Sequence, residues 1–410
     1  MTHGLTAPAQ AAPVRGTPKQ IVVLGAGTWV REQYAPALKP HREAGRCRVF
    51  VLFDSGYSKQ DDRLSSAEQL KYNATTLRNV EGFAAWGATC LDLADRKAAR
   101  FAQGIAPHTA FVVTPDDTHC DVVQDWANRA SNIIVEKPFD VDAERIRHLR
   151  ARLEGSSCDV AGFDHYLVRA NQFAKVSEAL GIDAYLEGRL HSFAFHMLES
   201  GDRGMEERQA SLQSGLLIDM AVHGEAMLLP FGAPNTVRLD GVKAAVYEPC
   251  PEKGVTSSGS KLLRSGMETF SEVRFGFTSK YGDDAEGIIR VGKCVGEEDE
   301  KFVEVVGGKD HDRKVRLDMR SCIVDRFGGK EEGPFTSLFR NPVHLLVREV
   351  IEGRSATSLA LFPPEEAQDI ITRVSEWRLP IVAFVQQGGT LASYPARMPL
   401  AEILKRATEL

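Results

Sequence analysis

A histidine and an aspartate four residues apart are the side chains best suited to proton transfer in this 410-residue sequence. Asp219 and His223 lie in the apolar run 215–229, which predicts a helix. A spacing of four residues places both side chains on one face of such a helix. Histidine exchanges protons near neutral pH, because its ordinary pKa is about 6.5. The same pair can ligate a metal ion, but no complete ligand set accompanies it, and we expect no metal site.

A short glycine turn follows the first apolar run, Ile21–Leu24. Gly25 permits a tight turn, and Gly27 lets the backbone approach a pyrophosphate. The helix expected after the turn directs its first N–H groups at the same phosphates. A third glycine is missing, since Val30 stands at its position. The pattern predicts a dinucleotide site, and the alternative is an ordinary turn between a strand and a helix.

An acidic residue, Asp54, ends the second apolar run, Val49–Phe53. A carboxylate at this place accepts hydrogen bonds from the hydroxyls of the adenosine ribose and repels a 2′-phosphate. We therefore expect NAD, with NADP disfavoured. The alternative is that Asp54 merely ends a strand.

Strand-length apolar runs alternate with helix-length segments in the first part of the chain. The runs are 21–24, 49–53, 110–113 and 133–135, and the helices between them are 31–44, 93–103 and 117–130. This alternation predicts a doubly wound parallel sheet, a Rossmann domain. Asp116 or Asp117 is placed to cap the last of these helices. A helix at 142–153 and a strand at 159–167 are expected next, and residues 55–87 are less regular.

Longer strands dominate the chain beyond residue 182. They are expected at 183–196, 239–248, 270–278, 286–294, 300–307 and 313–318, with helices at 215–229, 342–352 and 364–377. These segments predict an α+β domain with a large, mostly antiparallel sheet. We expect a flexible tail at 1–19, a Rossmann domain at 20–140 and a second domain at 141–410, whose closing helices, 342–377, can pack back on the first domain.

Two polar motifs end predicted parallel strands, at 114–119 (TPDDTH) and 136–138 (EKP). Open α/β sheets bind ligands at this carboxyl edge. Lys137 precedes a proline, which restricts its backbone and holds it rigidly. The alternative is a surface lysine paired with Glu136.

Together these motifs resemble the glucose-fructose oxidoreductase/inositol dehydrogenase/MocA family of nicotinamide-dependent oxidoreductases. The resemblance rests on Gly25-Ala-Gly27, the segment Thr114-Pro115-Asp116 with His119, Glu136-Lys137-Pro138, and Asp219-Met-Ala-Val-His223. It implies hydride transfer between a nicotinamide and a sugar or polyol carbon. The residues expected at the cofactor are Gly25, Gly27, Thr28, Trp29, Asp54, Thr114, Pro115, His119, Glu136 and Lys137.

A narrower segment, Phe163-Asp164-His165-Tyr166-Leu167-Val168-Arg169, resembles the DHYLGK motif of glucose-6-phosphate dehydrogenase. Valine and arginine stand at 168 and 169 where that motif has glycine and lysine. The likeness implies that His165, Tyr166 and Arg169 contact the substrate, and Arg169 suits a phosphate or carboxylate. The alternative is a junction of strand and helix held by local pairing.

The resemblance also implies the catalytic roles. His223 is expected to be the base and Lys137 to stabilise the reacting oxygen. Asp219 is expected to bind a substrate hydroxyl or to join the proton relay. The carboxylate that pairs with His223 stays open between Asp164 and Asp219. Two rival functions are a non-catalytic dinucleotide sensor of the same fold and a reductase of keto or imino groups.

Composition limits the partners. The net charge of −6 disfavours nucleic acid and anionic membrane, and no run is long enough to cross a bilayer. Seven cysteines, an odd number without a CxxC pair, disfavour a disulfide framework. We expect a cytoplasmic enzyme whose small-molecule substrate is a sugar, sugar phosphate or polyol, and the resemblance implies a homodimer or homotetramer.

Overall fold

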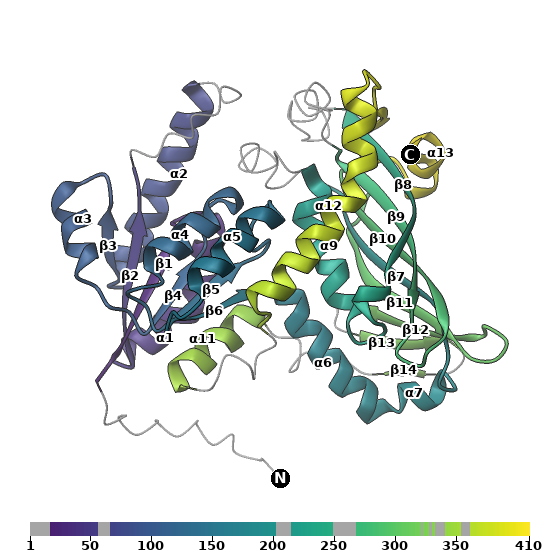
Figure 1. The fold of residues 1–410 in the computed structure, drawn as a ribbon, viewed down its shortest axis with the longest axis horizontal. Helices are drawn as coiled ribbons and strands as arrows, with labels where there is room; N and C mark the ends of the chain where they lie inside the picture. The colour runs from purple at the N-terminus through teal and green to yellow at the C-terminus, as the bar shows by residue number, and fades with distance from the viewer. Residues whose placement is uncertain are drawn as a thin grey trace, which may run out of the picture.

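The computed structural model describes residues 17–55, 66–201, 215–248, 268–320, 323–327, 330–332, 341–353 and 361–410. Only residues 17–19 of the expected tail fall within it. Figure 1 shows two sheets side by side, with the long helix α12 (Pro364–Gln386) running between them. In the described part of the chain, no helix is both long and apolar enough to span a bilayer.

Six parallel strands form the first sheet within the described residues, in the order β3-β2-β1-β4-β5-β6. They are β1 (Lys19–Leu24), β2 (Cys47–Phe53), β3 (Thr89–Asp92), β4 (Thr109–Val112), β5 (Asn132–Glu136) and β6 (Asp159–Phe163). The central runs are continuously apolar because helices bury both faces of the sheet. The predicted doubly wound fold is confirmed, and its sheet continues through β6, beyond residue 140.

The helices of this domain are α1 (Ala35–Glu43), α2 (Ser66–Ala85), α3 (Arg96–Gln103), α4 (His119–Trp126) and α5 (Ala143–Leu153). A π-helical turn, η1 (Val30–Tyr34), precedes α1. In that turn the N–H of Ala35 bonds to the carbonyl of Val30, and Pro36, which has no N–H, follows at the start of α1. Pro36 therefore follows directly after a turn whose hydrogen bond spans one residue more than in an α-helix.

The second sheet is mostly antiparallel, with the order β14-β13-β12-β11-β7-β10-β9-β8-β15 and β16 beside β8. Its strands are β7 (Leu190–Glu199), β8 (Arg238–Glu248), β9 (Phe270–Thr278), β10 (Asp284–Lys293), β11 (Glu300–Gly307), β12 (Arg313–Asp318), β13 (Ile323–Phe327), β14 (Lys330–Glu332), β15 (Ala392–Pro395) and β16 (Thr408–Glu409). The pairs β7/β10 and β8/β15 are parallel. The predicted α+β architecture is thus confirmed.

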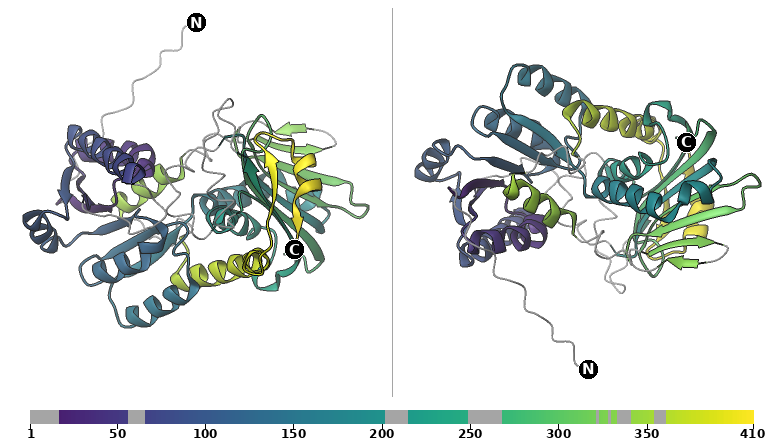
Figure 2. Two further views of the ribbon diagram at one scale, coloured as in Figure 1. Left: turned by 90° about the horizontal axis from the view of Figure 1, so that it is seen from above. Right: turned by 90° about the horizontal axis from the view of Figure 1, so that it is seen from below.

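Several helices lie between the two sheets, as Figures 1 and 2 show: α6 (His165–Leu180), α9 (Gly215–Leu228), α11 (Pro342–Glu352) and α12. The short α7 (Ile182–Tyr185) follows α6, and α13 (Leu400–Arg406) packs on β8 and β15. Helix α11 packs on α1, and α12 packs on both α5 and α9. Phe362 also pairs with the free edge of β6, exchanging backbone hydrogen bonds of 2.8 and 3.2 Å with Gly162. Such covering protects an edge strand from further pairing.

Several expected elements differ from the structure. The predicted strand 159–167 ends at Phe163, because the Asp164 side chain caps α6 and starts a helix there. The predicted strand 183–196 begins only at Leu190, after a turn in which Glu187 and Gly188 have positive φ angles of 56° and 63°.

The first domain also differs from expectation in three places. Part of the irregular stretch 55–87 is the helix α2, and the strand β3 follows it. Neither Asp116 nor Asp117 caps α4: both lie in a 3₁₀ turn, and Thr118 occupies the cap position without a side-chain hydrogen bond. The last long helix continues past Trp377 to Gln386.

Candidate active site

The glycine turn has the space that a pyrophosphate needs. Gly25 has a φ of +112°, and any side chain there would collide with the carbonyl of Val113. On the side of Gly27 where a Cβ would lie, no atom is found within 4 Å. The helix begins at once, with the N–H of Arg31 bonded to the carbonyl of Gly27 at 3.2 Å. These residues fit a dinucleotide phosphate bound at a helix N-terminus.

Asn79 of α2 forms hydrogen bonds with residues of the glycine turn and of the turn of helix after it. Its side chain is buried, donates a hydrogen bond to the carbonyl of Ala26 at 2.9 Å and accepts one from Arg31 at 3.2 Å. No motif marked Asn79 in the sequence, because α2 itself was not predicted.

Asp54 is exposed at the end of β2, where it can meet a ribose. Its neighbour Ser55 donates its N–H and its hydroxyl to Asp92, at the end of β3. Burial would raise the pKa of Asp92, but the hydrogen bonds from Ser55 and Ala94 outweigh it and lower that pKa. The ends of β2 and β3 therefore carry two carboxylates, of which the sequence pointed only to Asp54.

The two motifs at the ends of β4 and β5 are joined by a histidine. The ring of His119 is buried, with Nε2 2.9 Å from the carbonyl of Thr114 and Nδ1 3.0 Å from that of Pro138. Thr118 also donates its hydroxyl to that of Thr114 at 2.8 Å. The His119 side chain therefore orders the two loops, while the expected cofactor contacts of Thr114, Pro115 and His119 stay a prediction.

Glu136 ends β5 inside the first domain. One of its oxygens, Oε1, accepts hydrogen bonds from Trp29 Nε1 at 3.0 Å and from the Tyr34 hydroxyl at 2.7 Å. Burial raises the pKa of Glu136, against the lowering effect of these donors and of Lys137. The carboxylate is thus tied to the helix that follows the glycine turn.

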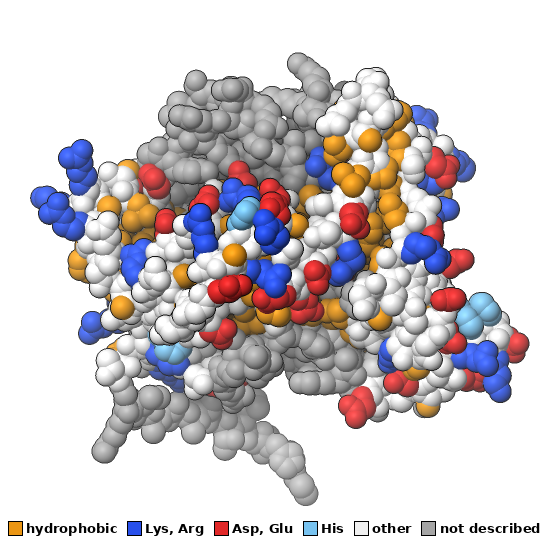
Figure 3. Space-filling model, viewed as in Figure 1, with side chains coloured by type: hydrophobic (Ala, Val, Ile, Leu, Met, Phe, Trp, Pro, Cys, Tyr) orange, Lys and Arg blue, Asp and Glu red, His pale blue; other side chains and the backbone are white. Residues whose placement is uncertain are grey.

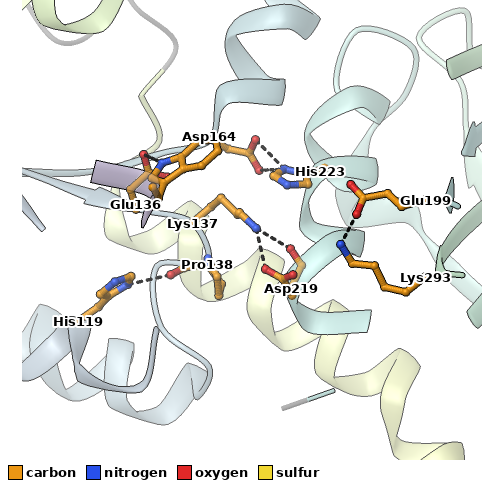
Figure 4. A network of polar contacts seen from close by, with 10 residues as sticks. His119, Glu136, Lys137, Pro138, Asp164, Glu199, Asp219, His223 and Lys293 are labelled. Carbon is orange, nitrogen blue, oxygen red and sulfur yellow. Dashed lines mark hydrogen bonds and ion pairs between the residues drawn. The ribbon is translucent and has the colours of Figure 1, made fainter. Parts of the chain in front are cut away.

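Lys137 points away from Glu136, toward helix α9 of the second domain. Its ammonium donates to Asp219 Oδ1 at 2.7 Å and to the Asp219 carbonyl at 2.9 Å. The two side chains are 12% and 9% exposed, so the pair is largely removed from solvent. Figure 4 shows Lys137 reaching from β5 to α9. The ion-pair partner of Lys137 is therefore Asp219, rather than Glu136.

Asp164 is the carboxylate that pairs with His223. Both of its oxygens lie 2.9 Å from His223 Nδ1, and Oδ1 also accepts the N–H of Tyr166 at 2.7 Å. Burial lowers the pKa of His223, and Lys137 adds to this, although Asp164 opposes it. Burial would raise the pKa of Asp164, but His223 outweighs it and holds that pKa well below its usual range. The pair is a neutral imidazole that donates Nδ1–H to an ionised carboxylate.

The three predicted substrate residues surround this pair from α6. The rings of His165 and Tyr166 lie 4.7 and 4.3 Å from that of His223, measured between centroids. Arg169 lies over the Tyr166 ring at 5.1 Å and donates to the carbonyl of Met319 at 3.1 Å. Burial lowers the pKa of His165 well below its usual value, and a proton on His223 would lower it further.

A second charged group lies on the strands behind Tyr166. Glu199 of β7 accepts hydrogen bonds from Lys293 of β10 and from Lys301 of β11, the latter at 2.6 Å. Burial would raise the pKa of Glu199, but the two lysines lower it to about 2. Burial raises the pKa of Tyr166, and the charges of Arg169, Lys301 and Glu199 also act on it. Sequence reasoning missed this group, because its members come from three strands.

Among the described residues, one group has metal-ligand geometry: single atoms of Asp164, His165 and His223 lie within 4.8 Å of one another. Two of these atoms already form the Asp164–His223 hydrogen bond. The group is therefore accounted for as an acid–base pair with an adjacent imidazole. Arg203 and Arg208, which precede the Asp219 helix in sequence and are candidates for contact with the substrate, lie outside the described residues.

The chain resembles known proteins at two levels. Residues 19–161 match the model of an oxidoreductase family with an NAD-binding Rossmann fold. Glucose-6-phosphate 1-dehydrogenase from Mycobacterium avium is 16% identical, with a TM-score of 0.60 over 92% of this chain and 94% of its own. A glucose-6-phosphate dehydrogenase bound to glucose-6-phosphate is 14% identical, with a TM-score of 0.63 over 95% of this chain and 97% of its own. UDP-N-acetylglucosamine 3-dehydrogenase from Acidithiobacillus ferrooxidans is 14% identical, with a TM-score of 0.54 over 90% of this chain and 99% of its own.

At these identities the structural likeness concerns the fold. No curated protein matches the chain in sequence. The family match covers the glycine turn, Asp54, Glu136 and Lys137, and it confirms the resemblance drawn from these motifs. Residues 19–161 therefore match this family of oxidoreductases in sequence, and the chain as a whole shares its fold with the solved dehydrogenases named above.

Proposed function

We propose that the protein transfers a hydride between NAD(H) and a secondary alcohol or ketone carbon of a sugar, sugar phosphate or polyol. The observation that carries this proposal is the Asp164–His223 pair beside Lys137, at the sheet edge that also holds the glycine turn. A proton acceptor and a fixed cation at one place are what alcohol oxidation requires of the protein.

His223 is the base in this proposal. Its lowered pKa keeps it uncharged at neutral pH, and donation of Nδ1–H to Asp164 fixes the tautomer in which Nε2 carries the lone pair. No hydrogen bond to Nε2 is found among the described residues. Nε2 can therefore take the hydroxyl proton, and the ionised Asp164 stabilises the imidazolium that forms.

Lys137 binds the reacting oxygen. Two of its three N–H donors are held by Asp219, which leaves one for the substrate. Developing negative charge on that oxygen is stabilised by a cation that needs no reorganisation. Asp219 acts by holding the ammonium in place, and in reduction the same groups return the proton.

The residues of the first domain fit the cofactor. Gly25, Gly27 and the helix start would hold its pyrophosphate, and Asp54 would hold the adenosine ribose and favour NAD. The bound nicotinamide supplies or accepts the hydride.

The second domain favours a polyhydroxylated substrate with an anionic group. Glu199, Lys293 and Lys301 offer charged partners for hydroxyls, with more positive than negative charge among them. Arg169 adds a planar guanidinium, which suits phosphate or carboxylate. Because the whole chain carries −6, attraction of an anion depends on these local cations.

The test is a panel of phosphorylated and unphosphorylated sugars and polyols with NAD⁺ and NADP⁺. Once turnover is found, His223→Gln and Lys137→Met are expected to lower kcat/KM by about 10³-fold, because each removes a group used in the transition state. NADH affinity should stay unchanged. His196→Gln and Lys314→Met, on the other face of the second sheet, are the matched controls and should keep wild-type rates. Near-normal rates in the first two variants would overturn these roles.

A non-catalytic sensor predicts a different outcome. Such a protein would bind NADH but give no redox change with any member of the panel. The complete set of Lys137, Asp164, Asp219 and His223 contacts favours the enzyme.

A further inference from the structure

Trp29 connects the glycine turn to the substrate side of the site. It is the second residue after Gly27, and its indole ring lies 5.5 Å from the imidazole of His165, between ring centroids. His165 is in turn 4.7 Å from the ring of His223. An unbroken series of aromatic rings therefore runs from the expected phosphate-binding turn to the proposed base.

The indole is held in a fixed orientation. Its Nε1–H donates to Glu136 Oε1 at 3.0 Å, and the Tyr34 hydroxyl donates to the same oxygen. Glu136 is 5% exposed and Tyr34 is fully buried, so this anchor belongs to the core of the first domain. A shift of the turn that moves the Trp29 backbone must therefore rotate or displace the ring against His165.

His165 is able to respond. Its Nδ1 is buried and has no hydrogen-bond partner among the described residues. Because that nitrogen is not held by a bond, packing against Trp29, Tyr166 and His223 fixes the position of the ring. A change on the Trp29 side alters one of the three contacts that define its place.

We propose that Trp29 is a positioning residue that couples occupancy of the glycine turn to the orientation of His165 at the substrate. The inference rests on the proposed dinucleotide site and adds the residue through which cofactor and substrate binding influence each other. Such coupling is reciprocal: a ligand at the turn changes the substrate side, and substrate changes affinity at the turn.

The probe is ADP-ribose, which carries the adenosine, pyrophosphate and ribose of NAD but lacks the nicotinamide, so a change at His165 does not come from contact with the nicotinamide ring. The full-length chain is labelled with ¹³C at the imidazole Cε1 of its 11 histidines, and the His165 signal is assigned by its loss in His165→Gln. ADP-ribose is expected to shift this signal in the wild type and to leave the signal of His196 unmoved.

Three variants separate coupling from simple destabilisation. Tyr34→Phe removes the other hydrogen bond to Glu136 but leaves the indole beside His165, and it should keep the shift. Trp29→Leu removes the ring and should abolish the shift at saturating ADP-ribose. Trp29→Phe retains an aromatic ring without its anchor and should show a reduced shift, which serves if the leucine variant does not fold.

Each outcome decides the question. A shift lost in Trp29→Leu, or reduced in Trp29→Phe, and kept in Tyr34→Phe supports the proposal. An equal shift in the Trp29 variants, or none in the wild type with ADP-ribose bound, overturns it while leaving the proposed function intact. Failure of both ADP-ribose and NADH to bind, measured by calorimetry, overturns the proposed dinucleotide site together with this inference.

Discussion

Two buried histidines, on opposite faces of the second sheet, have opposite partners. His223 faces the first domain and gives Nδ1–H to the carboxylate of Asp164. His196 of β7 lies on the other face, where Nε2 is 2.9 Å from the guanidinium of Arg290. An arginine can only donate, so Nε2 of His196 must be the acceptor and its lone pair is already engaged.

The charged groups around the two histidines also differ. Glu272 accepts hydrogen bonds from Arg290 at 2.6 Å and from Arg274 at 2.8 Å, so the guanidinium that is bonded to His196 is paired within the sheet. Burial lowers the pKa of His196 to about 3, and Arg290 and Arg316 contribute to this. Burial also lowers the pKa of His223, but there a carboxylate opposes the shift. A buried histidine therefore points to catalysis only where its accepting nitrogen is left available.

Figure 3 gives the wider setting of this contrast. Across the middle of the face that it shows, Lys and Arg side chains alternate with Asp and Glu side chains. Ion pairs such as Arg145–Asp121, Arg147–Glu144 and Arg150–Glu365 occur outside the site, so pairing alone does not mark it. Four substitutions test the difference between the two histidines.

Asp164→Asn should lower kcat by about 10³-fold, because the amide removes the charge that stabilises the imidazolium and no longer fixes its tautomer. Asparagine still caps α6, so folding should be preserved. Asp164 raises the pKa of His223, and its loss lowers that pKa further. The acidic limb of the kcat/KM profile, below pH of about 6.5 in the wild type, should therefore move to lower pH. An unchanged profile would contradict the pairing.

Glu272→Gln should destabilise the fold by about 3 kcal/mol, because it leaves two guanidinium groups without their carboxylate, one of them largely buried. The free energy of unfolding is measured by denaturant titration. The value of kcat/KM should stay at the wild-type level, and a large loss of activity without loss of stability would show that this cluster belongs to the site.

His196→Gln should reduce the acid sensitivity of the fold. The folded pKa of about 3 lies below the unfolded value, so the unfolded chain binds a proton first as the pH falls. The contribution of His196 to the free energy of unfolding therefore falls as the pH falls, by about 2 kcal/mol between pH 7 and pH 5. Between pH 7 and pH 5 the free energy of unfolding of the variant, measured by denaturant titration, should fall by about 2 kcal/mol less than that of the wild type. An equal fall in both proteins would contradict the low pKa of His196 in the folded state.

Lys314→Met should change little. The lysine ammonium lies 2.8 Å from Glu304 on the same face as His196, but its side chain is 37% exposed. Solvent-exposed ion pairs typically contribute less than about 1 kcal/mol. Thermal unfolding should shift by no more than a few degrees, which sets the lower end of the scale against which Glu272→Gln is judged.

The polar ends of parallel strands were the predictable part of the site. Lys137 and Asp54 follow apolar runs, and the carboxyl ends of such strands meet at one edge of a sheet. Asn79 was not predictable in this way, because it lies in the middle of a polar helix. Glu199, Lys293 and Lys301 also escaped detection: Glu199 and Lys293 face each other only because β7 and β10 pair in one particular register.

The choice of partner for His223 shows the same limit. Asp219 is four residues away and on the same helix, so the sequence favoured it as much as Asp164. The domains pack so that the Asp219 carboxylate meets Lys137, while the end of β6 brings Asp164 to His223. A hydrogen bond requires atoms within about 3 Å, and helical spacing alone does not set that distance between side chains.

Hydrophobic periodicity and turn chemistry act locally, so the doubly wound first domain, the glycine turn and the residue types at the strand ends follow from the residues alone. Which charges pair, which imidazole nitrogen stays available and the contact of Trp29 with His165 depend on the packing of the whole chain. Those contacts join segments more than 50 residues apart in sequence, and their geometry depends on how the two sheets pack across α9 and α12.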